Sequence, residues 1–207
     1  MGNVQLPTKR ELGFDLGVPR QTGDRTLGVS ILAGGLSSRM GRHKAGLRLG
    51  RRTLMGHVRS IGSQLGVPVR VIRRDLVGRC GPLGGVYTAL ATSRATGELF
   101  LACDMPFVSV ELLRRLQKQF LNGRPAVFVR AEGRLGFPFV LSCELLPQVR
   151  EQIDRAGFSL WALAKRLGAA AVPVRDTSQL ENINNPKELA RARARVGTAV
   201  ARSKMNL

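Results

Sequence analysis

Two glycines and two basic residues in one short stretch of the chain could together hold an anion. The apolar run Val29–Leu32 predicts a buried strand, and Gly34-Gly35 follows it closely. Because glycine has no Cβ, backbone N–H groups in such a turn can approach a ligand. Arg39 and Lys44 come next and supply a forked and a compact cation. The pattern favours a triphosphate site, although a glycine pair after a strand is by itself more often a simple turn.

This loop differs from the two best-known phosphate-binding loops. In a Walker A loop, Lys and then Ser or Thr directly follow the last glycine, whereas Gly41 is followed here by Arg42. The stretch also contains no Gly-x-Gly-x-x-Gly. The sequence therefore excludes a P-loop ATPase and an ordinary dinucleotide site at this position.

A second centre of chemistry is predicted at Asp104. The apolar segment Leu99–Cys103 predicts a buried strand, Asp104 lies at its carboxyl end, and Pro106 forces the chain to turn. An acid at this position could merely cap the turn. However, Mg²⁺ takes hard oxygen ligands and is often held by one or two carboxylates, with substrate phosphates completing its shell. We therefore assign Asp104 as a metal ligand.

Two asparagines near the end of the chain could serve the same site. Asn182 and Asn184 are two residues apart on a segment that reads as extended, so both side chains face the same way while Ile183 faces the core. Two neutral oxygen donors directed at one point suit a metal or a phosphate. The residues that follow are typical of a helix start, with an N-cap, a first helical residue and a capping-box partner: Asn185, Pro186 and Glu188.

Asp75 and the segment Gly81–Gly85 are less specific by themselves. Asp75 ends a second predicted strand and could be a solvated acid paired with Arg73 or Arg74. In the glycine-rich segment, Pro82 fixes one turn dihedral, and the glycines allow the backbone to approach either a ligand or a neighbouring helix. From the residues alone, a structural role and a binding role stay open for both.

The elements that must position these residues alternate between strands and helices. After the first strand, the pattern predicts helices at 54–65, 82–93, 110–120, 145–155 and 159–167, and strands at 67–72, 99–103, 125–129, 136–141 and 169–174. Ser109 is the expected N-cap of the helix at 110–120, and Trp161 is expected to face the core from the helix at 159–167. Units of about thirty residues in this rhythm are typical of an α/β fold with a mostly parallel sheet covered on both faces. Ligands collect at the carboxyl ends of such strands, where the glycines and acids occur.

Composition restricts the class of protein further. The chain has 207 residues, 43% of them hydrophobic and few aromatic, which suits one globular domain with an aliphatic core. We expect a flexible extension at 1–26, the domain at 27–196 and a frayed basic tail at 197–207. No apolar run is long enough to span a membrane, and the first residues lack a secretory signal, so a cytoplasmic protein is expected.

The charge and the cysteines argue against two other classes. The net charge of +19 is spread over nearly every segment and is not interleaved with aromatic residues, so the sequence does not favour nucleic-acid binding. We assign part of the charge to a site for small polyanions. Cys80, Cys103 and Cys143 are odd in number and form no Cys-x-x-Cys, which argues against zinc and against a disulfide framework.

Four motifs together resemble one enzyme family. Leu-Ala-Gly-Gly-x-Ser-x-Arg-Met-Gly-x-x-Lys-Ala, at residues 32–45, resembles the opening motif of the nucleotidyltransferases, and most of all the molybdenum cofactor guanylyltransferases (MobA-like family). Gly-Pro-Leu-x-Gly, Cys-Asp-x-Pro and Asn-x-Asn-x-Pro follow in the family's order at 81–85, 103–106 and 182–186. The resemblance runs from about Leu27 to Leu189. It departs from the family at His43, where many members have Asp, and in offering one strand instead of two between the first helix and Asp75.

The resemblance implies a Rossmann-like three-layer α/β sandwich of the nucleotide-diphospho-sugar transferase type. It implies transfer of GMP from GTP, with Mg²⁺, to the terminal phosphate of molybdenum-bearing molybdopterin, with release of pyrophosphate. Molybdoenzymes or insertion chaperones would receive the product. The catalytic residues implied are Lys44, Arg39 and Asp104, and the metal ligands are Asp104 and Asn184, with Asn182 in support. The nucleotide-binding residues implied are Leu32, Ala33, Gly34, Gly35, Lys44, Asp75, Gly81, Pro82, Leu83, Gly84 and Asp104.

Two alternatives stay open at this point. A nucleotidyltransferase of the same fold could use CTP or another phosphorylated acceptor, although the Gly-Pro-Leu-x-Gly motif favours guanine. From a different class, the chain could be a non-catalytic basic binding protein. In the resembled family, the second half of the chain presents the acceptor. It contains here Arg130, Arg134 and Lys165, which could meet an acceptor phosphate or could be plain surface.

Overall fold

The computed structural model describes residues 25–34, 46–78 and 80–205, with side chains up to residue 197. Its main sheet has six strands in the order β4 (Val69–Ile72), β1 (Leu27–Leu32), β5 (Gly97–Ala102), β7 (Arg134–Ser142), β6 (Ala126–Ala131) and β8 (Ala170–Pro173). A small separate hairpin consists of β2 (Arg48–Leu49) and β3 (Arg52–Thr53). The helices are α1 (Leu54–Ser63), α2 (Pro82–Ala91), α3 (Val110–Leu121), α4 (Leu146–Asp154), α5 (Leu160–Arg166) and α6 (Pro186–Met205), with single 3₁₀ turns at Cys143–Leu145 and Thr177–Leu180.

The sheet is mostly parallel, as the sequence predicted. β4, β1 and β5 run parallel to one another, and so do β6 and β8, while β7 is antiparallel to both of its neighbours. β7 reverses because a tight turn joins it to β6, with φ of 49° at Glu132 and 76° at Gly133. The carboxyl ends of β4, β1 and β5 therefore meet at one edge of the sheet.

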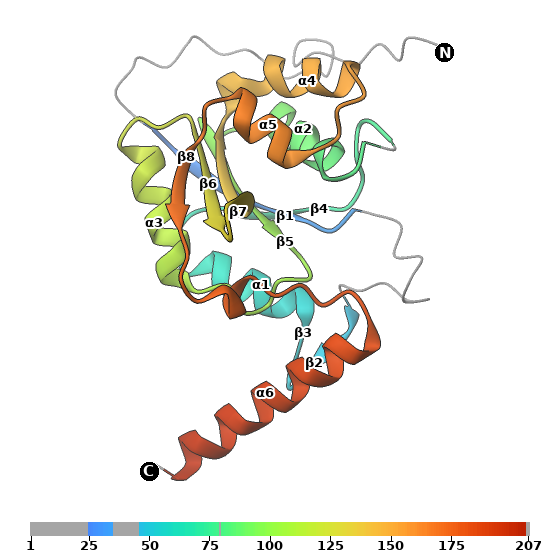
Figure 1. Ribbon diagram of the computed structural model, residues 1–207, viewed down its shortest axis with the longest axis vertical. Coiled ribbons are helices and arrows are strands. Elements are labelled where there is room, and N and C mark those ends of the chain that lie inside the picture. Colours follow the sequence, from blue (N-terminus) through green and yellow to red (C-terminus); the bar gives the residue numbers. More distant parts are fainter. Residues whose placement is uncertain (1–24, 35–45, 79, 206–207) are drawn as a thin grey trace.

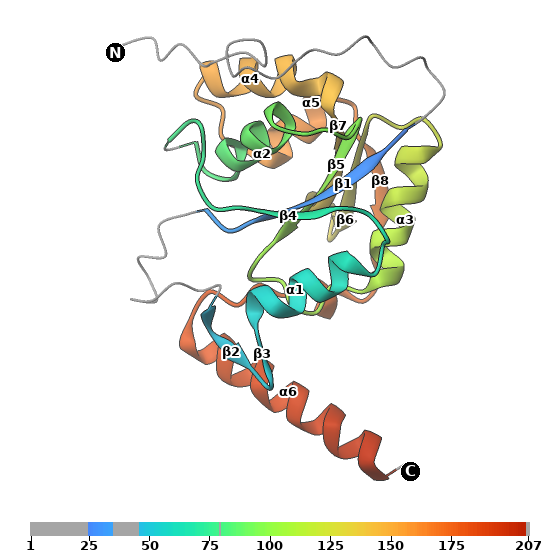
Figure 2. The same cartoon turned by 180° about the vertical axis from the view of Figure 1, so that it is seen from behind.

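Helices cover both faces of this sheet (Figures 1 and 2). α1 and α3 pack on one face over an aliphatic cluster that includes Val58 and Leu116. α2, α4 and α5 pack on the other face over a cluster in which Phe128 and Phe139 stack with ring centroids 4.5 Å apart. The predicted three-layer α/β sandwich is confirmed. None of the helices that the structure describes is long and apolar enough to cross a membrane.

A third apolar cluster attaches α6 to the small hairpin. It joins Leu49, Leu54, Ile183, Leu189 and Ala192, and it lies apart from the two clusters against the sheet. Beyond this contact, α6 projects from the body of the molecule (Figure 1). The helix continues to Met205, past residue 197, where the sequence analysis expected a frayed tail to begin. The expected extension at 1–26 lies almost wholly outside the described residues.

Helix caps formed as predicted because they depend on local sequence. The Ser109 side chain accepts from the Leu112 N–H at 3.2 Å, and the Asn185 Oδ1 accepts from the Glu188 N–H at 2.9 Å. One prediction about the core was wrong. The side chain of Trp161 is 45% exposed on α5, where it carries the Lys165 ammonium 4.2 Å from its ring centroid, and it does not point into the core.

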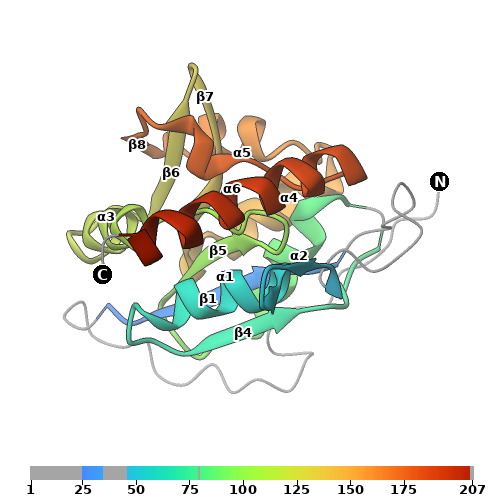
Figure 3. The same cartoon turned by 90° about the horizontal axis from the view of Figure 1, so that it is seen from below.

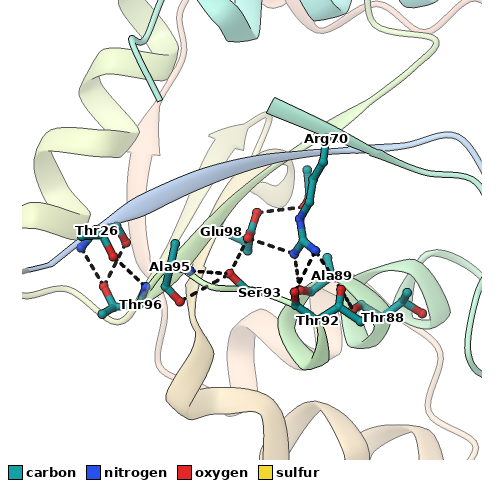
Figure 4. Close-up of polar contacts among 10 residues, drawn as sticks. Thr26, Arg70, Thr88, Ala89, Thr92, Ser93, Ala95, Thr96 and Glu98 are labelled. Carbon is teal, nitrogen blue, oxygen red and sulfur yellow. Dashed lines mark hydrogen bonds and ion pairs between the residues drawn. The ribbon is translucent and has the colours of Figure 1, made fainter. Parts of the chain in front are cut away.

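A buried ion pair ties the amino ends of the strands to α2 (Figure 4). Glu98 on β5 is 2% exposed, and its carboxylate accepts from Arg70 at 2.9 Å, Ser93 at 2.6 Å and Ser30 at 2.8 Å. Arg70 also donates to the main-chain oxygens of Ala89 and Thr92 at the end of α2. Both oxygens of the buried Glu98 carboxylate thus accept hydrogen bonds, one of them from a cation, which is the condition for a buried charge to be tolerated.

Candidate active site at the carboxyl edge of the sheet

Main-chain hydrogen bonds hold the three parallel strand ends together just beyond the sheet. The Ala33 N–H donates to the Ile72 oxygen at 2.9 Å, and the Cys103 N–H donates to the Leu32 oxygen at 3.2 Å. Leu32 and Ala33 therefore lie between the ends of β4 and β5. This arrangement brings Gly34, Asp75 and Asp104, which follow these three strands, to the same edge.

Asp75 lies against glycines from two different elements. A Cβ on Gly34 would be 3.2 Å from the Asp75 Oδ1, and a Cβ on Gly84 would be 2.8 Å from the Oδ2. The Cβ on Gly84 would also be 2.8 Å from the main-chain oxygen of Val77. Only glycine fits at position 84 with these neighbours in place. The carboxylate thus sits between the loop after β1 and the first turn of α2.

The Asp75 carboxylate is poorly compensated. Its Oδ1 is buried and has no hydrogen-bond partner among the residues that the structure describes. Burial raises the pKa of Asp75 above its ordinary value, because removal from water disfavours the charged form. Burial and then the Asp75 charge also raise the pKa of the neighbouring Cys80 thiol. A buried acceptor without a partner at a strand end is a feature that a ligand donor could satisfy.

The segment that opens α2 presents its backbone more than its side chains. Gly81 precedes the helix with φ of 56°, a conformation that favours glycine, and Pro82 is the first helical residue. Leu83 has no exposed surface and belongs to the core. A ligand at this point would therefore contact Leu83 through main-chain atoms, as the sequence analysis expected of this motif.

Asp104 meets the two asparagines across the sheet edge. The Ile183 N–H donates to the Asp104 main-chain oxygen at 2.9 Å, so segment 182–184 pairs with the residue that follows β5. Ile183 is 1% exposed, as its predicted inward direction requires, while Asn182 is exposed and Asn184 is half-buried. The Asn184 N–H donates to the Glu188 carboxylate at 2.5 Å, which ties this segment to the start of α6.

A cavity of about 610 Å³ borders Met105, the residue that follows Asp104. It is lined by Met105, Glu132, Arg134, Phe137, Leu180 and Asn182, among others. Two of these residues were predicted from the sequence, Arg134 as one of three that could meet an acceptor phosphate and Asn182 in support of the metal site. The other lining residues of the β6–β7 hairpin were not predicted, because the pairing of these two strands brings the hairpin to the carboxyl edge. Of the other two candidates for an acceptor phosphate, Arg130 does not line this cavity, and Lys165 lies over Trp161.

The predicted site residues thus fall into two described groups and one group outside the described part. Leu32, Ala33, Gly34, Asp75 and Gly81–Gly84 surround the ends of β1 and β4. Asp104, Asn182 and Asn184 gather beside β5, the next strand over. Gly35, Arg39 and Lys44 lie outside the residues that the structure describes. Within the described part, no three His, Cys, Asp or Glu side chains form a cluster that could hold a metal by themselves.

A mostly parallel sheet with acids and a glycine at the ends of neighbouring strands is typical of an α/β protein that binds its ligand at the carboxyl ends of the strands. Residues 29–174 match the sequence signature of the MobA-like NTP transferase domain, and the chain belongs to this family. A Flavobacterium johnsoniae protein described as a probable molybdenum cofactor guanylyltransferase is 28% identical over 79% of this chain and 95% of its own length.

Solved structures share the fold at lower identity. Molybdopterin-guanine dinucleotide biosynthesis protein A from Archaeoglobus fulgidus superposes with a TM-score of 0.65 at 20% identity, covering 83% of this chain and 99% of that one. A Mycobacterium tuberculosis protein in complex with manganese gives a TM-score of 0.53 at 20% identity, covering 72% and 88%. The Archaeoglobus fulgidus structure matches more of the chain than residues 29–174, so the shared fold extends beyond the segment that the family signature covers.

Proposed function

We propose that this protein transfers GMP from GTP to the terminal phosphate of molybdenum-bearing molybdopterin, with release of pyrophosphate. Membership of the MobA-like family and the names of its curated relatives support this reaction. The single observation that carries the assignment is the meeting of Gly34, Asp75 and Asp104 at one sheet edge. It places two acids of different surroundings at the carboxyl ends of the parallel strands.

The nucleoside would lie against Asp75 and the start of α2. The Oδ1 of Asp75 is an acceptor without a described partner, so it can take an N–H or O–H of the nucleoside. The main chain of Gly81–Gly84 offers N–H and C=O groups that can read the edge of a guanine base. The glycines at 34 and 84 let the Asp75 carboxylate lie close to both segments.

Asp104 and Asn184 would hold a divalent ion, which we take to be Mg²⁺. A carboxylate and an amide oxygen on adjacent segments suit a hard cation that keeps water and substrate phosphates in its shell. The manganese bound by the M. tuberculosis protein of the same fold is in keeping with such an ion. When bound, the ion supplies positive charge that lowers the repulsion between the reacting phosphates.

The chain's own contribution is to position two anions. The terminal phosphate oxygen of the acceptor forms a bond to the α-phosphorus of GTP, the bond to the β-phosphate oxygen breaks, and pyrophosphate leaves with its electron pair. The nucleophile is already an anion, so no side chain has to remove a proton from it. Following the family motif, Lys44 and Arg39 would hold the triphosphate and balance charge on the leaving group.

The acceptor would enter from the cavity beside Asp104. Asn182 lines this cavity, and Arg134 on β7 lines it from the opposite hairpin, so an anionic group there would meet one amide and one guanidinium. The cavity opens next to Met105, directly after the proposed metal ligand. An acceptor phosphate could therefore reach the α-phosphate without crossing the nucleoside site.

The test compares GTP, CTP, ATP and UTP in a pyrophosphate-release assay with molybdenum-bearing molybdopterin and Mg²⁺. We expect release with GTP to exceed release with each other nucleotide by at least about tenfold, and to require the acceptor. Preferred use of CTP would reassign the nucleotide. Failure of all four nucleotides to turn over would contradict the transferase assignment and favour a binding protein.

A further inference from the structure

The hairpin, the first helix and the last helix share a surface rich in arginine. We call it the basic face and define it by the exposed side chains of Arg48, Arg51, Arg52, Arg59, Arg191 and Arg193. These residues come from distant parts of the chain, but the apolar cluster of Leu49, Leu54 and Leu189 holds their elements together. Two views show β2 and β3 next to α6, with α1 adjoining β3 (Figures 2 and 3). The Arg193 guanidinium donates to the Arg48 main-chain oxygen at 3.2 Å.

Acidic side chains do not neutralise this face. Residues 46–66 contain no Asp or Glu, and Glu188, the one acid in α6, accepts from the Asn184 N–H at the helix start. Within the described ranges, none of the six arginines has an acidic side chain within ion-pair distance. On the opposite layer, by contrast, Glu151 pairs with Arg155 at 2.6 Å and with Arg166 at 3.1 Å. The positive charge of the basic face is therefore not compensated by acidic side chains of the described residues.

The basic face adjoins the candidate active site along the chain at two places. Arg48 comes four residues after Lys44, the predicted triphosphate ligand. α6 begins at Pro186, two residues after Asn184, and packs against β2. The positive electrostatic potential of this face therefore acts on anions that approach the edge where Asp104 and Asn184 meet.

The face lacks the features of a macromolecular docking site. The large apolar side chains that are exposed in the described part are Leu76, Leu121, Phe158 and Trp161, and none belongs to the hairpin, α1 or α6. Protein interfaces depend on buried aromatic and aliphatic anchors, and single-stranded nucleic acids need aromatic stacking. Charge without anchors suits an action at a distance on small, highly charged anions.

We propose that the basic face steers anionic substrates, GTP above all, into the active site and so raises their rate of association. The proposal rests on the proposed function, because it takes GTP as the substrate. An uncompensated patch beside a site raises the local concentration of an oppositely charged substrate and can increase association rates by about 10 to 1,000-fold at low salt. Steering of this kind acts on the arrival of GTP and not on the chemical step.

The experiment removes three charges at exposed positions whose guanidinium groups make no recorded hydrogen bond. The variant is Arg51→Gln/Arg59→Gln/Arg191→Gln. The matched control, Arg94→Gln/Lys118→Gln/Arg124→Gln, removes three exposed charges near the amino ends of β5 and β6, away from the site. Association of a fluorescent GTP analogue with Mg²⁺ is followed by stopped-flow at ionic strengths from 0.02 to 0.5 M.

We expect the basic-face variant to associate about three- to tenfold more slowly than wild type at the lowest ionic strength, with a difference below about twofold at the highest. Its dissociation rate and its turnover at saturating substrate should stay close to wild type, and the control should associate like wild type. Equal association rates for both variants at low salt would overturn the proposal. So would duplex DNA binding at 0.15 M salt that is lost in the basic-face variant without any change in GTP association.

This readout is independent of the transfer reaction. If wild type binds the GTP analogue with salt-dependent association but never releases pyrophosphate, the proposed function fails while the steering proposal stands. If pyrophosphate is released and association is insensitive to the three arginines, the steering proposal fails alone.

Discussion

At the scale of single residues, Asp75 is the group whose surroundings most need a ligand. Its Oδ1 is buried without a described partner, and glycines approach it from two elements. Asp104 differs from it, because main-chain pairing with Ile183 places it beside amide side chains. The two acids thus suit different roles, one in holding a neutral donor of the nucleoside and the other in holding a cation.

Substitution of Asp104 tests the metal role. Asp104→Asn should lower Mg²⁺-dependent pyrophosphate release by about 100-fold or more, because the amide keeps the shape but removes the charge that binds the ion. Lys44→Ala should have a loss of similar size, by the family motif. Circular dichroism and the urea midpoint serve as controls for folding. Turnover near the wild-type level in either variant would count against the proposed site.

Substitution of Asp75 tests the raised pKa. An acid whose pKa is raised in the folded state lowers the free energy of unfolding when it is ionised. This cost in stability is absent at low pH, because the acid is then protonated in both states. The cost appears as pH rises above the ordinary pKa of Asp, 3.8, and is complete above the raised folded value. Urea unfolding at several pH values should therefore show Asp75→Asn gaining stability over wild type as pH rises from 4 to 8. GTP affinity should fall about tenfold in the same variant. A constant stability difference across this range would contradict the assignment.

Gly84 tests the close packing around the carboxylate. Gly84→Ala should destabilise the protein by about 1 to 3 kcal/mol, because the added methyl group meets the Asp75 Oδ2 and the Val77 oxygen at 2.8 Å. Gly78→Ala is the matched control, since a Cβ there has nothing within 4 Å. Chemical denaturation measures both. Equal midpoints for the two variants would show that the contact relaxes without cost.

At the scale of elements, the site depends on contacts that hold strand ends and helix starts. At the opposite edge, Arg70 links β4, β5 and the end of α2 through Glu98 and two main-chain oxygens. This linkage lies at the amino ends of the strands, so it stabilises the fold without involving the residues of the candidate site.

Loss of the Arg70 guanidinium should be costly for stability alone. Arg70→Ala leaves the Glu98 carboxylate buried without its cation, and we expect a loss of about 2 to 4 kcal/mol in the free energy of unfolding. The lower end of that range reflects the 32% exposure of the Arg70 side chain. Arg74→Ala, at an exposed position, is the control. At a temperature below the thermal unfolding midpoint of Arg70→Ala, the Kd of this variant for GTP should differ from the wild-type Kd by less than twofold.

Elements differ in how far the sequence predicts them. The caps at Ser109 and Asn185 depend on a few adjacent residues and were predicted correctly. The pairing of Asp104 with Ile183 joins distant segments, so no local pattern encodes it, although the resemblance placed both at one site. Trp161 was wrongly assigned to the core, because helical spacing alone does not show which apolar side chain meets the sheet. Nothing local marks Glu98 as buried.

At the scale of the whole molecule, the net charge of +19 opposes compaction. Like charges on the folded surface repel one another. At 0.1 M salt, the repulsion between exposed charges more than about 10 Å apart is largely screened. We therefore expect the thermal midpoint to rise by a few degrees between 0.02 and 0.3 M NaCl, measured by differential scanning fluorimetry. The basic-face variant should show a smaller rise than wild type. A midpoint that falls with added salt would indicate that attractive pairs outweigh the repulsion.

The pairing of Ile183 with Asp104 makes one half of the candidate site depend on the attachment of α6. Ile183 shares an apolar cluster with Leu49 of the hairpin and Leu189 of α6, and the same residue binds the main chain of Asp104. Detachment of α6 would therefore separate Asn184 from Asp104 while the surroundings of Asp75 stay in place.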